Sequence, residues 1–200
     1  MKLLIVGGTG TIGRAVVDLL SREHEVVPVG HTGGEYRVDL GARESIRRLF
    51  EQVGRVDAVV SAAGQAAFRP LDQLTDEDFE LSLGNKLMGQ VNLVREGLRH
   101  VSDGGSITLT SGVLSQEPMP GSAAVSLVNA GLEGFARAAA LEAPRGIRVN
   151  VVSPPWVSET LRAMGKDPSG GLPAATVARA YRESVLGSGT GQVIDARRFA

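Results

Sequence analysis

A glycine cluster between a short apolar run and an amphipathic segment is the feature that most restricts how this chain can fold. Lys2–Val6 has the pattern of a buried strand, and Ala15–Leu20 has helical periodicity. Between them, Gly8, Gly10 and Gly13 satisfy the spacing G-x-G-x-x-G. Glycine at these positions permits a tight turn, close approach of the backbone to a diphosphate, and tight packing of the helix on the strand. The free N–H groups at the helix start can hold phosphates. The stretch therefore predicts a dinucleotide-binding turn.

Strand and helix patterns alternate along the whole chain, which predicts a parallel sheet with helices on both faces. Further strands are expected at Glu25–Val29, Tyr36–Val38, Val56–Val60, Ser106–Thr110, Ile147–Val152 and Gly191–Ile194. Helices are expected at Ala42–Val53, from Thr75 onward, at Ala123–Leu141 and at Ala174–Leu186, and a surface loop at Gly165–Pro173. Thr75 fits an N-cap, with Asp78 at the third helical position. We expect one doubly wound α/β domain of the Rossmann type over residues 1–200, with seven parallel strands.

The charge balance and the absence of cysteine exclude several classes of function. The chain has 21 basic and 22 acidic residues, so nothing favours binding to nucleic acid or to an anionic membrane. It has no cysteine, which excludes disulfides and thiolate chemistry. His24 and His100 have no companion ligands, so no metal site is expected. The first strand leaves no room for a signal peptide and no run is long enough to span a membrane, so we expect a cytoplasmic protein.

The end of the second expected strand bears on the choice of dinucleotide. An NAD site places an acidic residue about twenty positions after the glycines, where it binds the ribose 2′-hydroxyl. This chain has Gly30, His31 and Thr32 there instead. His31 and Thr32, with Arg14, suit a 2′-phosphate, so NADP is favoured over NAD; the alternative is that His31 is simply an exposed loop residue.

Four segments together resemble the short-chain dehydrogenase/reductase superfamily over nearly the whole chain. They are Ser61–Gly64, Ala130–Phe135, Arg145–Pro154 and Thr190–Val193. The resemblance implies that the cofactor is held by Gly7, Thr9, Gly10, Thr11, Ile12, Gly13, His31, Thr32, Asp39, Leu40, Ala62, Ala63, Gly64, Pro154 and Val157. The spacing of Gly7, Gly10 and Gly13 is nearer to the extended and atypical branches. The chain is also shorter than the usual member, mostly after Pro154, where the family carries a substrate-binding lid.

The active-site pattern of the family is only partly present. The family uses a Tyr as proton donor or acceptor, a Lys four residues later, a Ser that polarises the carbonyl, and an Asn that orders a water. Ser111 matches the Ser, but Val125 stands at the Tyr position and Asn129 at the Lys position. Lys86 stands at the Asn position. Asn85 would serve only if the register of that helix slipped.

We therefore expect an exchanged pair, with Lys86 reaching toward the ribose or substrate and Asn129 facing it. The alternative is that Lys86 is an ordinary exposed lysine and Asn129 a satisfied helix residue. The resemblance implies an NADP-dependent oxidoreductase for a small carbonyl or alcohol, in which Ser111, Lys86 and Asn129 form the active site. A catalytically silent NADP-binding sensor or scaffold remains open, as does an atypical reductase or isomerase. The family also implies a homodimer or homotetramer through the two long helices, from Thr75 and from Ala123.

Overall fold

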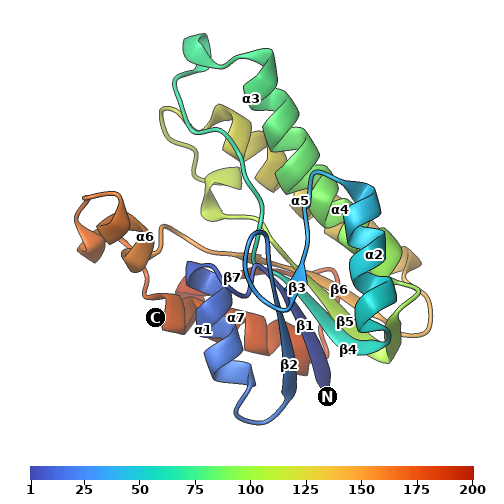
Figure 1. The fold of residues 1–200 in the computed structure, drawn as a ribbon. Coiled ribbons are helices and arrows are strands. Elements are labelled where there is room, and N and C mark those ends of the chain that lie inside the picture. Colours follow the sequence, from blue (N-terminus) through green and yellow to red (C-terminus); the bar gives the residue numbers. More distant parts are fainter.

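The computed structural model describes residues 1–200, whose seven parallel strands form one sheet in the order β3-β2-β1-β4-β5-β6-β7 (Figure 1). The strands are β1 (Lys2–Val6), β2 (Glu25–Gly30), β3 (Tyr36–Arg37), β4 (Val56–Ser61), β5 (Val101–Thr110), β6 (Arg148–Ser153) and β7 (Val193–Asp195). The strand order reverses between β1 and β4, and ligands of open α/β sheets bind at the carboxyl ends of the strands at such a point. The predicted Rossmann-type fold is confirmed.

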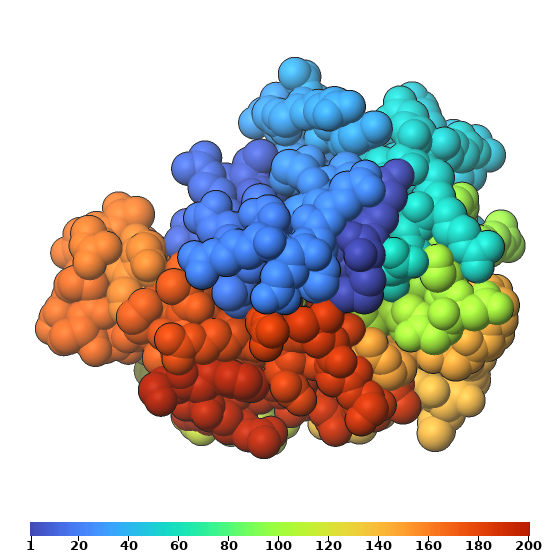
Figure 2. Space-filling view, turned by 90° about the horizontal axis from the view of Figure 1, so that it is seen from below, coloured from blue at the N-terminus to red at the C-terminus, as the bar shows by residue number.

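Helices cover both faces of the sheet because the strands are apolar on both sides. Alternate residues of β1 point to opposite faces: Leu4 and Val6 enter one buried cluster, and Leu3 and Ile5 enter the other. The first cluster packs under α2 (Arg43–Val53), α4 (Gly89–Gly97) and α5 (Ala123–Glu142). The second packs under α1 (Thr11–Leu20) and α7 (Ala174–Leu186), which lie side by side in Figure 2.

The helix expected from Thr75 begins where predicted but is not one continuous α-helix. Thr75 caps α3 (Asp76–Leu81): its hydroxyl accepts from the Asp78 backbone N–H at 3.3 Å, and the Asp78 carboxylate accepts from the Thr75 N–H at 3.1 Å. The segment Ser82–Met88 is then π-helical, and α4 follows. A π-helix inserts extra residues into the turn, so it shifts the helical register at Lys86.

Other boundaries also differ from the sequence prediction. Strand β5 begins at Val101 rather than Ser106, with a shift of its register against β4 near the start. A short helix, α6 (Ser158–Ala163), was not predicted, and the expected loop Gly165–Pro173 contains one 3₁₀ turn. Polar and glycine residues at these places obscure the periodicity on which the prediction depends. No helix is long and apolar enough to cross a bilayer.

Candidate functional site

The turn between β1 and α1 is built so closely that two of its glycines cannot carry a side chain. Gly7 has a φ of +82°, and a Cβ added to it would lie 2.6 Å from the Ala62 carbonyl oxygen. A Cβ on Gly13 would lie 1.9 Å from the Gly7 carbonyl oxygen. The Gly10 N–H is bonded to the Gly7 carbonyl at 2.9 Å, which closes the turn. Gly10 and Thr11 are exposed, so the backbone at the start of α1 is accessible, as a diphosphate site requires.

A cleft of about 580 Å³ lies above this turn, at the carboxyl ends of β1, β2 and β4. Predicted cofactor residues in its lining are Gly7, Thr9, Gly10, His31, Asp39, Leu40, Ala62, Ala63 and Gly64. Gln65, Glu80 and Asn85 also line it and were not predicted. The Asp39 carboxylate accepts from the Gly41 N–H at 2.9 Å, so it is already engaged locally.

Four predicted cofactor residues near the turn and β2 lie outside the lining of the cleft: Thr11, Ile12, Gly13 and Thr32. Thr11 and Ile12 form the first turn of α1 with Gly13, and N–H groups in a first helical turn have no partner within the helix. The Ile12 side chain turns down to the apolar cluster under α1. Thr32 is exposed beside His31 and outside the lining of the cleft.

A second cavity, of about 270 Å³, brings together the predicted active-site residues. Ser111 and Asn129 line it, together with Lys86 and with Val125, which stands at the tyrosine position. Its apolar wall is completed by Val113, Leu114, Pro154, Pro155, Trp156 and Val157. The predicted cofactor residues Pro154 and Val157 thus lie in this cavity rather than in the larger cleft. The two spaces adjoin, because Gly64 and Asn85 face one and Lys86 the other.

Lys86 points into the protein from the π-helical segment. Its Nζ donates to the backbone carbonyl of Thr110 at 3.4 Å, and burial lowers the pKa of Lys86 to about 8. The aliphatic part of the side chain lies against the turn after β4: a Cβ on Gly64 would lie 3.0 Å from the Lys86 Cγ. Lys86 is therefore not the ordinary exposed helix lysine of the alternative reading.

Gln90 fixes this region to the end of β5. Its Nε2 donates to the Thr110 carbonyl at 2.9 Å and to the Lys86 carbonyl at 3.2 Å, and its Oε1 accepts from the Thr110 N–H at 2.8 Å. The π-helix directs Asn85 away from the cavity, where its Oδ1 accepts from the Gln65 N–H at 2.8 Å. The register shift therefore leaves Lys86, and not Asn85, at the smaller cavity.

Ser111 and Asn129 both line the cavity, but the hydroxyl of Ser111 is hydrogen-bonded and one polar side-chain atom of Asn129 is not. The Ser111 hydroxyl donates to the buried carboxylate of Glu133 at 3.1 Å. Asn129 is 2% exposed, and its Nδ2 donates weakly to the Gly112 carbonyl at 3.4 Å, while its Oδ1 has no partner. An unpaired buried acceptor costs free energy unless a ligand or water supplies a donor.

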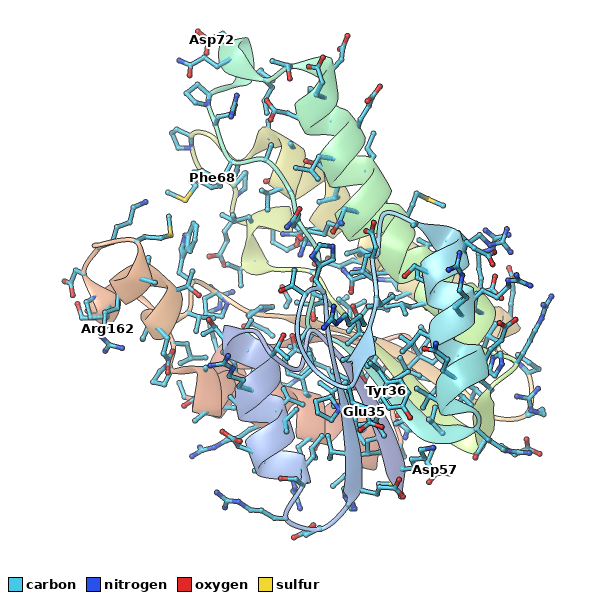
Figure 3. The ribbon with its side chains drawn as sticks, viewed as in Figure 1. Glu35, Tyr36, Asp57, Phe68, Asp72 and Arg162 are labelled. Atoms are coloured by element: carbon cyan, nitrogen blue, oxygen red, sulfur yellow. The ribbon has the colours of Figure 1, made fainter.

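Aromatic side chains lie at the rim of the smaller cavity. Phe68 meets the Trp156 ring edge-on, with centroids 5.7 Å apart, and the Lys166 ammonium lies 5.8 Å from the centroid of that ring. Figure 3 labels Phe68 on the segment before α3 and Arg162 on α6, the two projections that flank this rim. The cavity therefore combines an apolar wall and mouth with a few polar groups, as small-molecule sites do.

Thr110 joins the two layers of the molecule at this point. Its carbonyl accepts from Lys86 and Gln90 on one side of the sheet. Its hydroxyl donates to the Ser61 carbonyl and shares a 2.6 Å hydrogen bond with the Tyr181 hydroxyl, from α7 on the other side. Burial raises the pKa of Tyr181. Tyr181 does not line the smaller cavity, so it does not stand in for the missing phenol.

The turn, the reversal of strand order and the cleft above them define a Rossmann-type nucleotide-binding protein. A sequence model of the family described as Enoyl-(Acyl carrier protein) reductase matches residues 11–186. The chain belongs to the short-chain dehydrogenase/reductase superfamily of oxidoreductases, as its motifs predicted.

Individual relatives agree with this assignment. An uncharacterized oxidoreductase of Methylorubrum extorquens is 26% identical over 201 residues, which cover 86% of this chain and 81% of the relative. The crystal structure of the protein lin1944 from Listeria innocua is 42% identical, covers 98% of both chains and has a TM-score of 0.93. A small-chain dehydrogenase solved in complex with NADPH is 27% identical, with 98% and 95% covered and a TM-score of 0.85.

Beside the smaller cavity, Glu133 and Gln90 contact the predicted active-site residues but were not singled out from the sequence. Glu133 lies four residues after Asn129, and this spacing places the two on one face of α5. That spacing was an available signal. Gln90 had none, because its contacts depend on the π-helical register.

Proposed function

We propose that the protein is an NADPH-dependent oxidoreductase that interconverts a small carbonyl compound and its alcohol. The observation that carries the proposal is the gathering of Lys86, Ser111 and Asn129 around one cavity beside the glycine turn. The ammonium of Lys86 and the hydroxyl of Ser111 are suited to bind an oxygen that gains negative charge during reduction.

The residues of the larger cleft fit a dinucleotide. The backbone around Gly7, Gly10 and Gly13 would hold the diphosphate. Asp39 and Leu40 would lie beside the adenine, and Ala62–Gly64 would contact the cofactor along its length. Pro154 and Val157, in the smaller cavity, would back the nicotinamide. When bound, the nicotinamide supplies or accepts a hydride.

Three observations support NADPH over NADH. Strand β2 ends at Gly30, the next four residues (His31–Gly34) are not acidic, and His31 lines the cleft there. Arg14 on α1 and Arg37, which pairs with Gly30 in the sheet, lie outside the lining of the cleft, but both are exposed and form no ion pair. The small-chain dehydrogenase that resembles this chain was solved with NADPH. Cationic side chains near the ribose favour a 2′-phosphate.

In this proposal Lys86 takes the place of the missing phenol, since Val125 cannot transfer a proton. The Lys86 ammonium stabilises the charge on the reacting oxygen. Because its pKa is about 8, it can also share a proton with that oxygen near neutral pH. Ser111 and Asn129 orient the substrate.

A catalytically silent NADPH-binding protein is the second candidate, and Val125 at the tyrosine position is the observation that favours it. Loss of a proton-transferring group lowers rates by about 10²- to 10⁴-fold, so a protein that lost its tyrosine without replacement would bind cofactor and turn over poorly.

The test combines binding with turnover. We expect NADPH to raise the melting temperature more than NADH, because ligand affinity for the native state adds directly to stability. NADPH oxidation is then followed against a panel of small carbonyl compounds with the wild type, Lys86→Met and Lys86→Arg. Lys86→Met should lower turnover by about 10²- to 10⁴-fold. Lys86→Arg keeps the charge but cannot share a proton, and should recover only part of the loss.

The pH dependence gives the control on this assignment. Lys86 is protonated below its pKa of about 8, so wild-type carbonyl reduction should fall as the pH rises through that value. The Lys86→Met variant should not show this fall in activity with rising pH. NADPH binding without turnover of any compound would support the catalytically silent protein instead. Equal increases of the melting temperature by NADPH and NADH would contradict a site for the 2′-phosphate.

A further inference from the structure

Glu133 is a buried carboxylate that is surrounded by hydrogen-bond donors. It lies on α5 and is 1% exposed. Its Oε1 accepts from the hydroxyls of Ser111, at 3.1 Å, and Ser115, at 2.5 Å. Its Oε2 accepts from Gln116 Nε2 at 3.2 Å and lies 3.8 Å from the guanidinium of Arg137. A carboxyl group that only accepts, with a cation beside it, has the hydrogen-bonding pattern of the ionised form.

These contacts form a continuous path from the smaller cavity to the surface. Ser111 lines the cavity, Glu133 is enclosed, and Ser115 is half-buried at the outer end. Each of the two hydroxyls has a transferable proton directed at the same carboxylate oxygen. Lys86 has no such path, because its hydrogen-bond partner is a backbone carbonyl, which carries no proton to exchange.

We propose that Ser111, Glu133 and Ser115 form a proton relay that connects the reacting oxygen with solvent, with Glu133 as its central proton acceptor. The relay deepens the proposed function and rests on it. It assigns the role of proton exchange to a residue outside the Ser, Tyr, Lys and Asn pattern. Lys86 then donates a hydrogen bond to the reacting oxygen and stabilises its charge, and the relay carries the net proton of each turnover.

The step can be written for oxidation of an alcohol. The substrate O–H bond breaks and its proton goes to Ser111 Oγ, as the proton of Ser111 passes to Glu133 Oε1. The carbinol carbon would lose a hydride, and NADP⁺ held in the larger cleft would be the oxidant that accepts it. Glu133 then passes its proton to Ser115 Oγ, which releases its own proton to water and so restores the carboxylate. Carbonyl reduction follows the same path in reverse.

Glu133→Gln separates a relay from a purely structural role. Glutamine accepts hydrogen bonds from the same hydroxyls but does not take up a proton. We expect it to retain NADPH binding and a melting temperature near that of the wild type, while turnover falls by about a hundredfold or more. Glu142→Gln, at the exposed end of the same helix, is the matched control and should leave turnover unchanged.

A second readout does not depend on turnover. Trifluoroethanol, an acidic alcohol that resists oxidation, is added to the protein saturated with NADP⁺, and proton release is measured with an indicator dye. The wild type should release protons rapidly after mixing, and Glu133→Gln should release them much more slowly. No release from the wild type, or equal rates of release and equal turnover in wild type and Glu133→Gln, would overturn the relay.

Ser115→Ala keeps the proposal testable if Glu133→Gln does not fold. Because Ser115 is half-buried, water partly replaces its hydroxyl, so we expect a smaller loss of turnover with an increased solvent deuterium isotope effect. An unchanged isotope effect would contradict the relay. The proposed function fails separately, if the wild type neither binds NADPH nor turns over any compound in the panel.

Discussion

At the scale of single residues, absent side chains matter as much as those that are present. Gly7 and Gly13 leave no space for a Cβ, so the turn keeps this close packing only with glycine at both positions. The opposite holds at the smaller cavity, where Lys86, Ser111 and Asn129 project from three different elements. The glycine turn can be predicted from spacing along the chain, whereas the grouping of side chains around the smaller cavity depends on how the chain folds.

Gly13→Ala should disrupt the turn. The added Cβ would lie 1.9 Å from the Gly7 carbonyl oxygen, so the backbone must shift. We expect the variant to lose stability by about 1–3 kcal/mol, the usual range for overpacking, and to bind NADPH weakly. Thermal unfolding with and without NADPH measures both effects.

Gly134→Ala is the matched control for this prediction. Gly134 lies in α5, and its added Cβ would meet no atom within 4 Å. Alanine is favoured over glycine in helices by about 1 kcal/mol, so this variant should be as stable as the wild type or more so. A Gly13→Ala variant that matched it in stability and NADPH binding would disprove the crowding of the turn.

At the scale of elements, the π-helical segment Ser82–Met88 determines which side chain reaches the cavity. Gln90 stabilises it by bonding to both the Thr110 backbone and the carbonyl of Lys86. A strand end and a helix are thus joined by one amide side chain.

Gln90→Leu should therefore destabilise the protein and displace Lys86. The substitution leaves the buried N–H of Thr110 without its partner, which costs about 1–3 kcal/mol. Urea unfolding measures this loss of stability. The pH at which carbonyl reduction falls measures whether the pKa of Lys86 has changed. Gln52→Leu, at an exposed position of α2, is the control. Equal stability of the two variants would contradict the assigned role of Gln90.

The sequence predicted the sheet and the glycine turn well because both depend on local patterns. The apolar run Lys2–Val6 and the spacing of Gly7, Gly10 and Gly13 are contained in one short stretch. The Thr75 cap was predicted in the same way, because a capping box links the N-cap residue to the third helical position, here Asp78. The sequence analysis expected Lys86 to reach toward the ribose or substrate. The contacts of Gln90 and the hydroxyl groups around Glu133 were not predictable, since they depend on a π-helical register and on a loop that is distant in the sequence.

At the scale of the whole molecule, the predicted self-association has a surface that could support it. Leu83 and Met88 of the π-helical segment and Leu127 of α5 are exposed, at 37%, 41% and 50%. The π-helical segment packs beside α5, so apolar side chains of both are available outside the core. Such patches commonly mark protein interfaces.

We expect the 20.9 kDa chain to form a dimer or tetramer, measured by size exclusion with light scattering. Leu127→Glu should shift it toward the monomer, because a charge is costly in an apolar interface. Met164→Glu replaces an exposed apolar residue of the segment after α6 and should have no effect. A wild-type monomer would exclude association through these helices.

The hydrogen bonds of Thr110 have a further consequence for how the protein can vary. Tyr181, on the far side of the sheet, is separated from the ammonium of Lys86 by one threonine residue. We therefore expect that a substitution in the α7 layer that moves the phenol also shifts the ammonium of Lys86, without altering any residue that lines the smaller cavity. Natural or engineered variation in the smaller cavity can therefore originate in the buried residues of a helical layer on the opposite face of the sheet.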